Sequence, residues 1–212
     1  MWIFVCFGVP GWRYFERQVG YSHNQWAGVM TGHHLILGKL VDFITGETLD
    51  DTHDERYRQK LAHLLVENKG YLKKEIQSRF ELVAAAGDSK AIVRVDYVIT
   101  LGGKTGMIIK YGPGSLVTRH RSVLAASRLV VPYQIPIAVV TNGEDADILD
   151  GKKGNVLARG LAAIPAKSEL KAKIESAAFS AIAAERAEKE SRILYCYEVD
   201  DSCPCDDTIC RL

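Results

Sequence analysis

The stretch AIVRVDYVITLGGKTGMIIKY, residues 91–111, decides the fold. Two runs rich in β-branched residues, 91–101 and 107–111, flank the short connection GGKTG. Runs of this kind joined by a glycine-containing turn predict an antiparallel β-hairpin. Asp96 lies inside the first apolar run, and Lys110 lies at the end of the second. These two charged side chains are the first candidates for a functional site.

Helical and strand-like patterns lie on both sides of this hairpin. Thr52 and Glu55 form a T-x-x-E capping box, so we expect a helix from about Asp54 that ends at Gly70. The other expected elements are a strand at 78–86, a helix at 113–130, a doubly buried strand at 135–143, two short strands within 146–160 and an amphipathic helix at 168–190. This order predicts an α/β fold with a mixed sheet flanked by helices.

The composition is that of an ordinary globular protein. The 212 residues are 47% hydrophobic and 25% charged, and 27 Lys and Arg balance 26 Asp and Glu, which leaves a net charge of +1. A nucleic-acid partner therefore requires a local basic patch. No apolar run reaches the ~18 residues of a membrane helix, and the N-terminus lacks the basic flank of a signal peptide. We therefore expect a cytoplasmic protein without a membrane partner.

Four parts are expected along the chain. Residues 1–29 are rich in aromatic residues and glycine and show no clear period, so they are an extension or a misassigned start before Met30. The α/β domain is expected at 30–165 and a helix at 166–195. A cysteine-rich tail then occupies 196–212.

The aspartate inside the apolar strand needs a partner. A buried bare carboxylate is costly, so Asp96 must be hydrogen-bonded, paired or bound to a metal. The hairpin brings Asp96 and Lys110 to the same end of the sheet. Such a pair suits metal-assisted phosphodiester cleavage, in which the carboxylate holds Mg²⁺ and the lysine steadies the attacking water or the developing charge. A purely structural Asp–Lys pair at a sheet edge is the alternative, and the spacing alone favours it.

The segment from about residue 52 to 150 resembles the N-terminal nuclease domain of type I restriction enzyme R subunits, within the PD-(D/E)XK nuclease superfamily. The resemblance is carried by DERYRQKLAHLLVENKGY, VRVDYVITL, MIIKYG and IPIAVVTNGEDADILDG, in this order. It implies a restriction-endonuclease-like mixed sheet with flanking helices. It also implies an Mg²⁺ site in which the first helix supplies Glu55, the middle strand supplies the metal ligand Asp96, and Lys110 is the catalytic lysine.

The sequence departs from the family pattern at one position. The E-x-K motif of the family places a metal-binding glutamate two residues before the lysine, and Ile108 stands there. Isoleucine cannot bind a metal, so another carboxylate reaches the site, or the site binds metal weakly, or it is inactive. Glu55 and Glu75 are the candidate replacements. Glu55 is preferred because the family pattern places a glutamate on that helix, although its capping-box role is a complete structural explanation.

Basic residues follow the lysine-ended strand. In the nuclease superfamily the next helix often faces the active site and the nucleic acid, so its arginines are candidates for phosphate contacts. The candidates are Arg119, Arg121 and Arg128 on that helix, with Lys73, Lys74 and Arg79 as an extension of the patch. An ordinary solvated helix face is the alternative.

Cysteines gather at the end of the chain. Cys196, Cys203, Cys205 and Cys210 have the spacing C-x6-C-x-C-x4-C, which matches no standard zinc pattern. Four thiolates so close together suit a tetrahedral Zn²⁺ site or an iron–sulfur cluster. Free thiols or disulfides formed on oxidation are the alternatives.

Two functions stay open. The first is an Mg²⁺-dependent DNA endonuclease that uses Asp96, Lys110 and Glu55. The second is a catalytically inactive nuclease-fold protein that binds nucleic acid or a protein partner. Ile108 favours the second, and the presence of both Asp96 and Lys110 favours the first. In either case we expect DNA as ligand and a restriction-modification or DNA-processing protein as partner. A regulatory protein built around a metal-bound tail is a third possibility.

Overall fold

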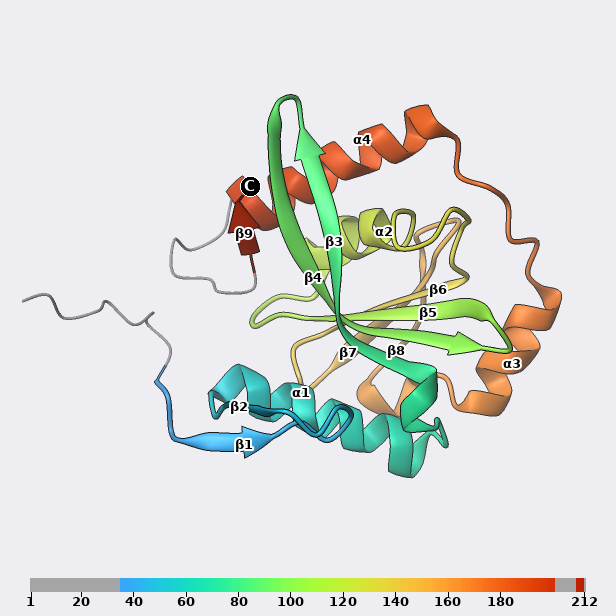
Figure 1. Ribbon diagram of the computed structural model, residues 1–212. Helices are drawn as coiled ribbons and strands as arrows, with labels where there is room; N and C mark the ends of the chain where they lie inside the picture. Colours follow the sequence, from blue (N-terminus) through green and yellow to red (C-terminus); the bar gives the residue numbers. More distant parts are fainter. Residues whose placement is uncertain (1–34, 201–208, 212) are drawn as a thin grey trace, which may run out of the picture. The chain divides into compact units, whose positions relative to one another are not determined.

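The computed structural model describes residues 35–200 and 209–211 (Figure 1). The expected extension 1–29 and the tail residues Cys203 and Cys205 lie outside the described residues.

The described chain contains both strands and helices. The strands are β1 Lys39–Val41, β2 Thr48–Asp50, β3 Ile76–Ala86, β4 Ser89–Leu101, β5 Lys104–Tyr111, β6 Ile137–Thr141, β7 Ala146–Asp150, β8 Val156–Arg159 and β9 Ile209–Arg211. The α-helices are α1 His53–His63, α2 His120–Ala126, α3 Lys167–Ser176 and α4 Ala184–Tyr195. Shorter turns of 3₁₀ or π geometry are η1 Leu64–Asn68, η2 Lys73–Glu75, η3 Val117–Arg119, η4 Leu161–Ala163 and η5 Cys196–Asp200.

The main sheet is mixed, as predicted. It has seven strands in the order β3-β4-β5-β6-β7-β8, with β9 paired to β4, and β1 and β2 form a separate two-stranded sheet. Only β5 and β6 pair in parallel in the main sheet, because α2 carries the chain across between them. All five residues of β6 are buried, which confirms the expected doubly buried strand.

Two apolar clusters cover the two faces of the sheet. One face packs against α2, α4 and η5, with Ile108 and Leu194 among its fully buried side chains. The other packs against α1 and α3, with Leu61, Ile109 and Leu170 among its members. Burial of each such side chain stabilises the fold by about 1.5–3 kcal/mol. The adjacent residues Ile108 and Ile109 point to opposite faces, as the period of a strand requires.

On one of its edges, strand β4 changes its pairing partner at its middle, and we call this place the fork. One edge pairs with β3 from Ser89 to Ile99, so β5 and β9 must share the other edge. On that edge β9 pairs with Ala91–Val93, and the pairing with β5 starts at Tyr97. Figure 1 shows the β3–β4 arm bending away from β5 at this point. Residues 94–96 therefore lie in the opening of a fork between two strands.

The C-terminal helix is divided. The amphipathic pattern predicted a single helix over 168–190, but α3 ends at Ser176 and α4 starts at Ala184. Between them Phe179 has φ 33°, a left-handed conformation that a helix excludes. The intervening segment instead forms backbone hydrogen bonds, from Gln134 N–H to Ser180 O and from Ile182 N–H to Pro132 O. The prediction of one continuous helix was wrong because these tertiary contacts override the local periodicity.

The other two helix predictions are confirmed with shifted bounds. α1 starts at His53 and its π-helical continuation ends before Gly70, which has φ 75° as a left-handed C-terminal residue. The helix expected at 113–130 is shorter, because only η3 and α2 are helical.

Candidate functional site

Asp96 lies on β4 at the fork, and Lys110 lies opposite it on β5. The β4–β5 pairing begins at Tyr97 and Ile109, one residue beyond both side chains. Asp96 Oδ2 accepts a hydrogen bond from the Tyr111 N–H at 2.6 Å. Lys110 Nζ donates to the Arg94 carbonyl at 3.3 Å. Each side chain thus binds the backbone of the opposite strand where the regular pairing stops.

The second carboxylate oxygen of Asp96 is held by helix α1. Arg58 Nε donates to Asp96 Oδ1 at 2.7 Å, and the guanidinium lies 5.0 Å from the centre of the Tyr111 ring. Burial acts to lower the pKa of Arg58, but the charge and hydrogen bond of Asp96 outweigh it and raise that pKa. Among the described residues, no ion pair joins Asp96 to Lys110. The partner of Asp96 is therefore an arginine.

Glu55 has a different role from the one its spacing predicts. Thr52 Oγ1 accepts the Glu55 N–H at 3.1 Å, which is the expected half of the capping box. The Glu55 carboxylate does not complete the box. Its Oε1 accepts from Gln59 Nε2 at 2.8 Å and from Arg79 Nη2 at 2.7 Å. The capping box is therefore not the complete explanation of Glu55, whose side chain joins an internal charge network.

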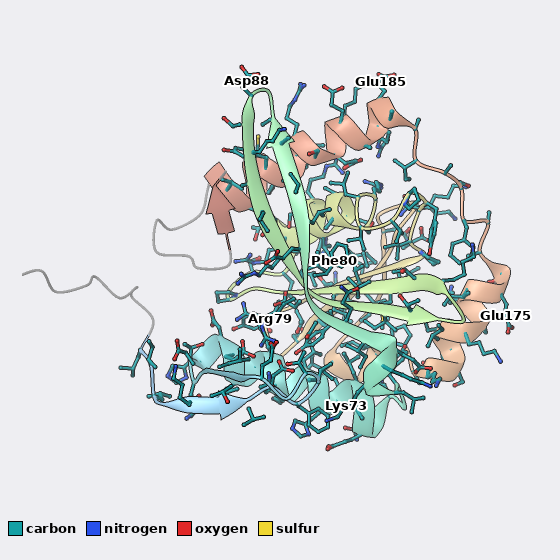
Figure 2. The ribbon with its side chains drawn as sticks, viewed as in Figure 1. Lys73, Arg79, Phe80, Asp88, Glu175 and Glu185 are labelled. Atoms are coloured by element: carbon teal, nitrogen blue, oxygen red, sulfur yellow. The ribbon has the colours of Figure 1, made fainter. Side chains whose placement is uncertain are left out.

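Arg79 connects this network to strand β3. Its pairing position is skipped in the β3–β4 ladder, and its φ of 51° is left-handed. The other end of its guanidinium, Nη1, binds Asp42 Oδ2 at 2.6 Å. Figure 2 shows Arg79 on the α1 side of the bend and the next residue, Phe80, on the α2 side. Such a backbone conformation costs about 1–2 kcal/mol, which the two ion pairs offset.

Asp42 is the most buried acid of this network. Its Oδ1 accepts the N–H groups of Ile44 and Thr45, and Gln59 Nε2 reaches its Oδ2. Burial acts to raise the pKa of Asp42, but these hydrogen bonds and Arg79 together lower that pKa to about 2. We call Asp42, Glu55, Arg58, Arg79 and Asp96 the α1 charge network. This network pairs three carboxylates with two guanidinium groups.

Lys110 is bound on the opposite face of the sheet. It is only 5% exposed, and its Nζ donates to Glu198 Oε2 of η5 at 2.9 Å. Burial acts to raise the pKa of Glu198, but Lys110, a hydrogen bond from Ser122 and the charge of Arg119 lower it. The partner of the lysine is a glutamate 88 residues further along the chain.

Two of the predicted DNA-binding arginines attach helix α4 to the domain. Glu190 is fully buried and meets Arg121 at 3.2 Å, Arg128 at 3.0 Å and Arg186 at 2.6 Å. Arg128 is 7% exposed and also donates to the Gly151 carbonyl. Burial and the neighbouring Arg186 and Arg121 lower the pKa of Arg128 despite its carboxylate partner. A DNA phosphate cannot reach Arg128 unless α4 is displaced.

A comparison with known families finds a match for the middle of the chain. The family described as the N terminus of type I restriction enzyme R proteins matches residues 53–165, which is more than half of the chain. The chain belongs to this family. No curated protein and no solved structure matches it. The R-protein N-terminal region includes Glu55, Asp96 and Lys110, whereas Glu190 and Glu198 lie beyond it.

The residues present do not fit the Mg²⁺ site that the R-protein resemblance implies. Both oxygens of Asp96 are bound by Arg58 and Tyr111, and Glu55 is bound by Arg79 and Gln59. The position of the missing glutamate, Ile108, is 0% exposed inside the apolar cluster. Within residues 35–200, no group of three or more His, Cys, Asp or Glu side chains could hold a metal ion.

The remaining basic candidates of the R-protein domain lie apart from one another. Lys73 donates to the Phe43 carbonyl and lies 3.8 Å from the centre of its ring, on the α1 side of the sheet. Lys74 is its exposed neighbour. Arg119 and Arg121 flank the start of α2, which packs on the other face. The lysines and the arginines therefore do not form one continuous patch.

Two of the four tail cysteines belong to the described residues. The Cys196 side chain is exposed and free, and Cys210 contributes backbone pairing to β4. Cys203 and Cys205 lie outside the described residues. The zinc or iron–sulfur site at this tail stays a prediction, which the metal content and visible absorption of the purified protein would test.

No helix within the described ranges is long and apolar enough to cross a membrane.

Three partners of the predicted site were missed by sequence reasoning: Arg58, Arg79 and Glu198. Arg58 and Arg79 are charged residues at unremarkable positions of a helix and a strand. Glu198 carries no sequence signal, because its contact with Lys110 spans 88 residues. The single available hint was the need of a strand aspartate for a counter-charge, and this need does not identify the partner.

Proposed function

We propose that this protein is a DNA-binding member of the R-protein N-terminal family that does not cleave DNA. The observation that carries the proposal is the pairing of every candidate catalytic side chain with a protein partner. Asp96 binds Arg58, Glu55 binds Arg79, and Lys110 binds Glu198.

The energetics of these ion pairs disfavour the entry of a magnesium ion into the site. Their side chains are 7–26% exposed, so each charge has lost much of its hydration. Removing one partner from such a pair leaves an uncompensated charge and costs about 3–5 kcal/mol. A magnesium ion would have to displace guanidinium groups from both carboxylates and would still lack the ligand that Ile108 replaces. Two arginines supply the positive charge that a metal would bring.

Two observations support DNA as the ligand: the family of the chain and the two arginines at the start of α2, Arg119 in η3 and Arg121 in α2. Arg121 keeps 38% exposure in its pair with Glu190, and Arg119 is half-buried beside Gly112. Planar guanidinium groups at a surface suit phosphate oxygens. We expect a restriction-modification protein as the partner that supplies further activities.

Binding can be measured by fluorescence anisotropy with a labelled duplex at low salt. The double variant Arg119→Gln/Arg121→Gln should weaken binding by about tenfold. A matched control is Lys152→Gln/Lys153→Gln, which removes the same charge from the exposed β7–β8 turn. The control should change affinity less than about twofold. Equal losses in both double variants would show that only net charge matters, and absence of binding by the wild type would refute the DNA-binding proposal.

Mg²⁺-dependent DNA cleavage is the second candidate. One observation favours it: Asp96 and Lys110 lie at the same end of the β4–β5 ladder. Supercoiled and single-stranded DNA should be incubated with Mg²⁺ or Mn²⁺ and with wild type, Asp96→Ala or Lys110→Ala. We expect intact DNA in all three cases. Cleavage by the wild type that both variants lose would establish the enzyme and refute the non-cleaving proposal.

A further inference from the structure

The carboxylate of Glu198 lies among groups that bind phosphate. The Lys110 ammonium is 2.9 Å from Glu198 Oε2. The Ser122 hydroxyl and the positive charge of Arg119 both lower the pKa of this carboxyl, and Ser122 Oγ also donates to the Arg119 carbonyl at 3.3 Å. Ammonium, hydroxyl and guanidinium groups are the side-chain donors that proteins use for phosphate oxygens. An internal carboxylate therefore binds the ammonium of Lys110 close to two further groups of the kinds that bind anions.

The arrangement is built into the fold. Lys110 and Ser122 are 5% and 2% exposed, so neither is a mobile surface side chain. Gly112 lets Arg119 lie against the end of β5, because a Cβ at this position would meet the guanidinium carbon at 2.5 Å. Arg119 Nη2 also donates to the Pro113 carbonyl at 3.1 Å. These groups belong to the R-protein N-terminal region, whereas Glu198 comes from beyond it.

We propose that Lys110, Arg119 and Ser122 form a phosphate site for the DNA backbone, which Glu198 occupies in the free protein and from which DNA displaces it. This inference rests on the proposed DNA-binding function. It adds a defined phosphate contact and a reason for the engagement of Lys110 in the absence of DNA.

The displacement requires movement of η5. Helix α4 is anchored by the buried Glu190 and by Leu194, which is 0% exposed. Glu198 belongs to the five-residue turn after this helix and has a side chain 13% exposed. Val199 of this turn is fully buried, so opening of the turn exposes this one apolar side chain at a cost of about 1.5–3 kcal/mol. The last turn can therefore open while α4 and its arginine contacts stay in place.

The exchange of carboxylate for phosphate keeps the site neutralised. A buried Lys–Glu pair contributes little net stability, because the loss of hydration offsets most of the attraction. When a phosphate enters, Lys110 and Arg119 keep an anionic partner and Glu198 returns to water. The duplex also brings many phosphates to the same surface, which raises the local concentration of competing anions.

The test compares two full-length variants that each lose one negative charge. Glu198→Gln removes the competing carboxylate with little change in shape. Glu188→Gln is the matched control, because Glu188 is 73% exposed on α4 and pairs with Arg192. The probe is a fluorescein-labelled duplex of ~20 base pairs at low salt. We expect Glu198→Gln to bind it about tenfold more tightly than the wild type does. The salt dependence of its affinity should be steeper by about one phosphate contact. Glu188→Gln should differ from wild type less than about twofold.

Each outcome decides one of the two proposals. Equal affinity of wild type and Glu198→Gln, or an equal gain in Glu188→Gln, overturns the displacement of Glu198 and leaves DNA binding in place. Absence of binding by every protein refutes the proposed function itself. If Glu198→Gln does not fold, hydrogen exchange of the wild type decides. DNA should then speed exchange of the η5 amides and leave α4 unchanged, and unchanged η5 exchange in the bound protein would overturn the inference.

Discussion

Asp96 and Lys110 lie on either side of the fork between β4 and β5, and each binds the backbone of the other's strand. Asp96 accepts the Tyr111 N–H, and Lys110 donates to the Arg94 carbonyl. These bonds replace the ladder bonds that the diverging strands no longer form. On one face of the sheet Asp96 also accepts a hydrogen bond from Arg58. On the opposite face Lys110 also donates a hydrogen bond to Glu198. Asp96 and Lys110 therefore connect the sheet to α1 on one face and to η5 on the other.

Arg79→Ala should destabilise the protein by about 3 kcal/mol, because the buried carboxylate of Asp42 would lose its cationic partner and Glu55 would keep only the more distant Arg58. Arg79→Gly removes the same guanidinium but relieves the positive φ, so it should be more stable than Arg79→Ala by about 1 kcal/mol. Urea unfolding measures both differences. The control is Arg56→Ala, an exposed pair with Asp51, which should cost less than about 1 kcal/mol. Equal stability of the Ala and Gly variants would contradict the strain assigned to Arg79.

The same substitution should create affinity for divalent cations. In Arg79→Ala the carboxylates of Asp42 and Glu55 lose the cation they share, and Ca²⁺ or Mn²⁺ can supply the missing charge. Millimolar Mn²⁺ should raise the melting temperature of the variant by a few degrees and leave the wild type unchanged. A wild type that is stabilised equally would mean that the arginines do not exclude a metal.

Asp42 should make stability depend on acid pH. Its folded pKa of about 2 lies below the ordinary value of 3.8 for an aspartate, so its contribution is present above about pH 4 and is lost as the pH falls through about 2. The shift corresponds to roughly 2 kcal/mol. The wild type should exceed Asp42→Asn by at least this amount at pH 7, and the gap should narrow below pH ~4. A gap that is constant from pH 7 to pH 3 would contradict the lowered pKa of Asp42.

Glu190 should behave as a buried anchor. Glu190→Gln leaves Arg128 without a counter-charge and should cost about 3 kcal/mol, which corresponds to a loss of about 6–12 °C in Tm. The double variant Arg128→Met/Glu190→Met should recover most of this loss, because Arg121 and Arg186 are exposed enough to be hydrated. Glu188→Gln on the same helix is the control. Thermal unfolding of the wild type, Arg128→Met, Glu190→Met and the double variant gives the coupling energy, and simple additivity would contradict a direct Arg128–Glu190 interaction.

Gly112→Ala should impair DNA binding without unfolding the protein. The added methyl group meets the guanidinium of Arg119, a flexible side chain that can move away at small cost. Stability should change by less than about 1 kcal/mol, while DNA affinity falls about as far as in Arg119→Gln. Anisotropy and thermal unfolding measure the two effects. An unchanged affinity would show that the position of Arg119 against β5 is not needed for binding.

Local patterns predicted much of the fold. The β-branched runs, the glycine turn and the capping residue Thr52 produced the hairpin, the start of α1 and the mixed sheet that the structure has. The error at 168–190 has a tertiary cause, because residues 180–182 bond to the chain near Pro132 and Gln134. Such a contact has no signature in a helical period.

The sequence by itself determined that a charge must be compensated inside β4, that Ile108 removes a metal ligand, and that the chain resembles R-protein N-terminal regions. These conclusions need only residue type, spacing and the cost of burying a carboxylate. Only the tertiary structure decided which groups compensate the charges. Arg58, Arg79 and Glu198 come from separate elements, and their contacts depend on the bend at the fork and on the return of the chain after α4. Pairings over such distances follow from packing geometry, which the order of residues does not reveal.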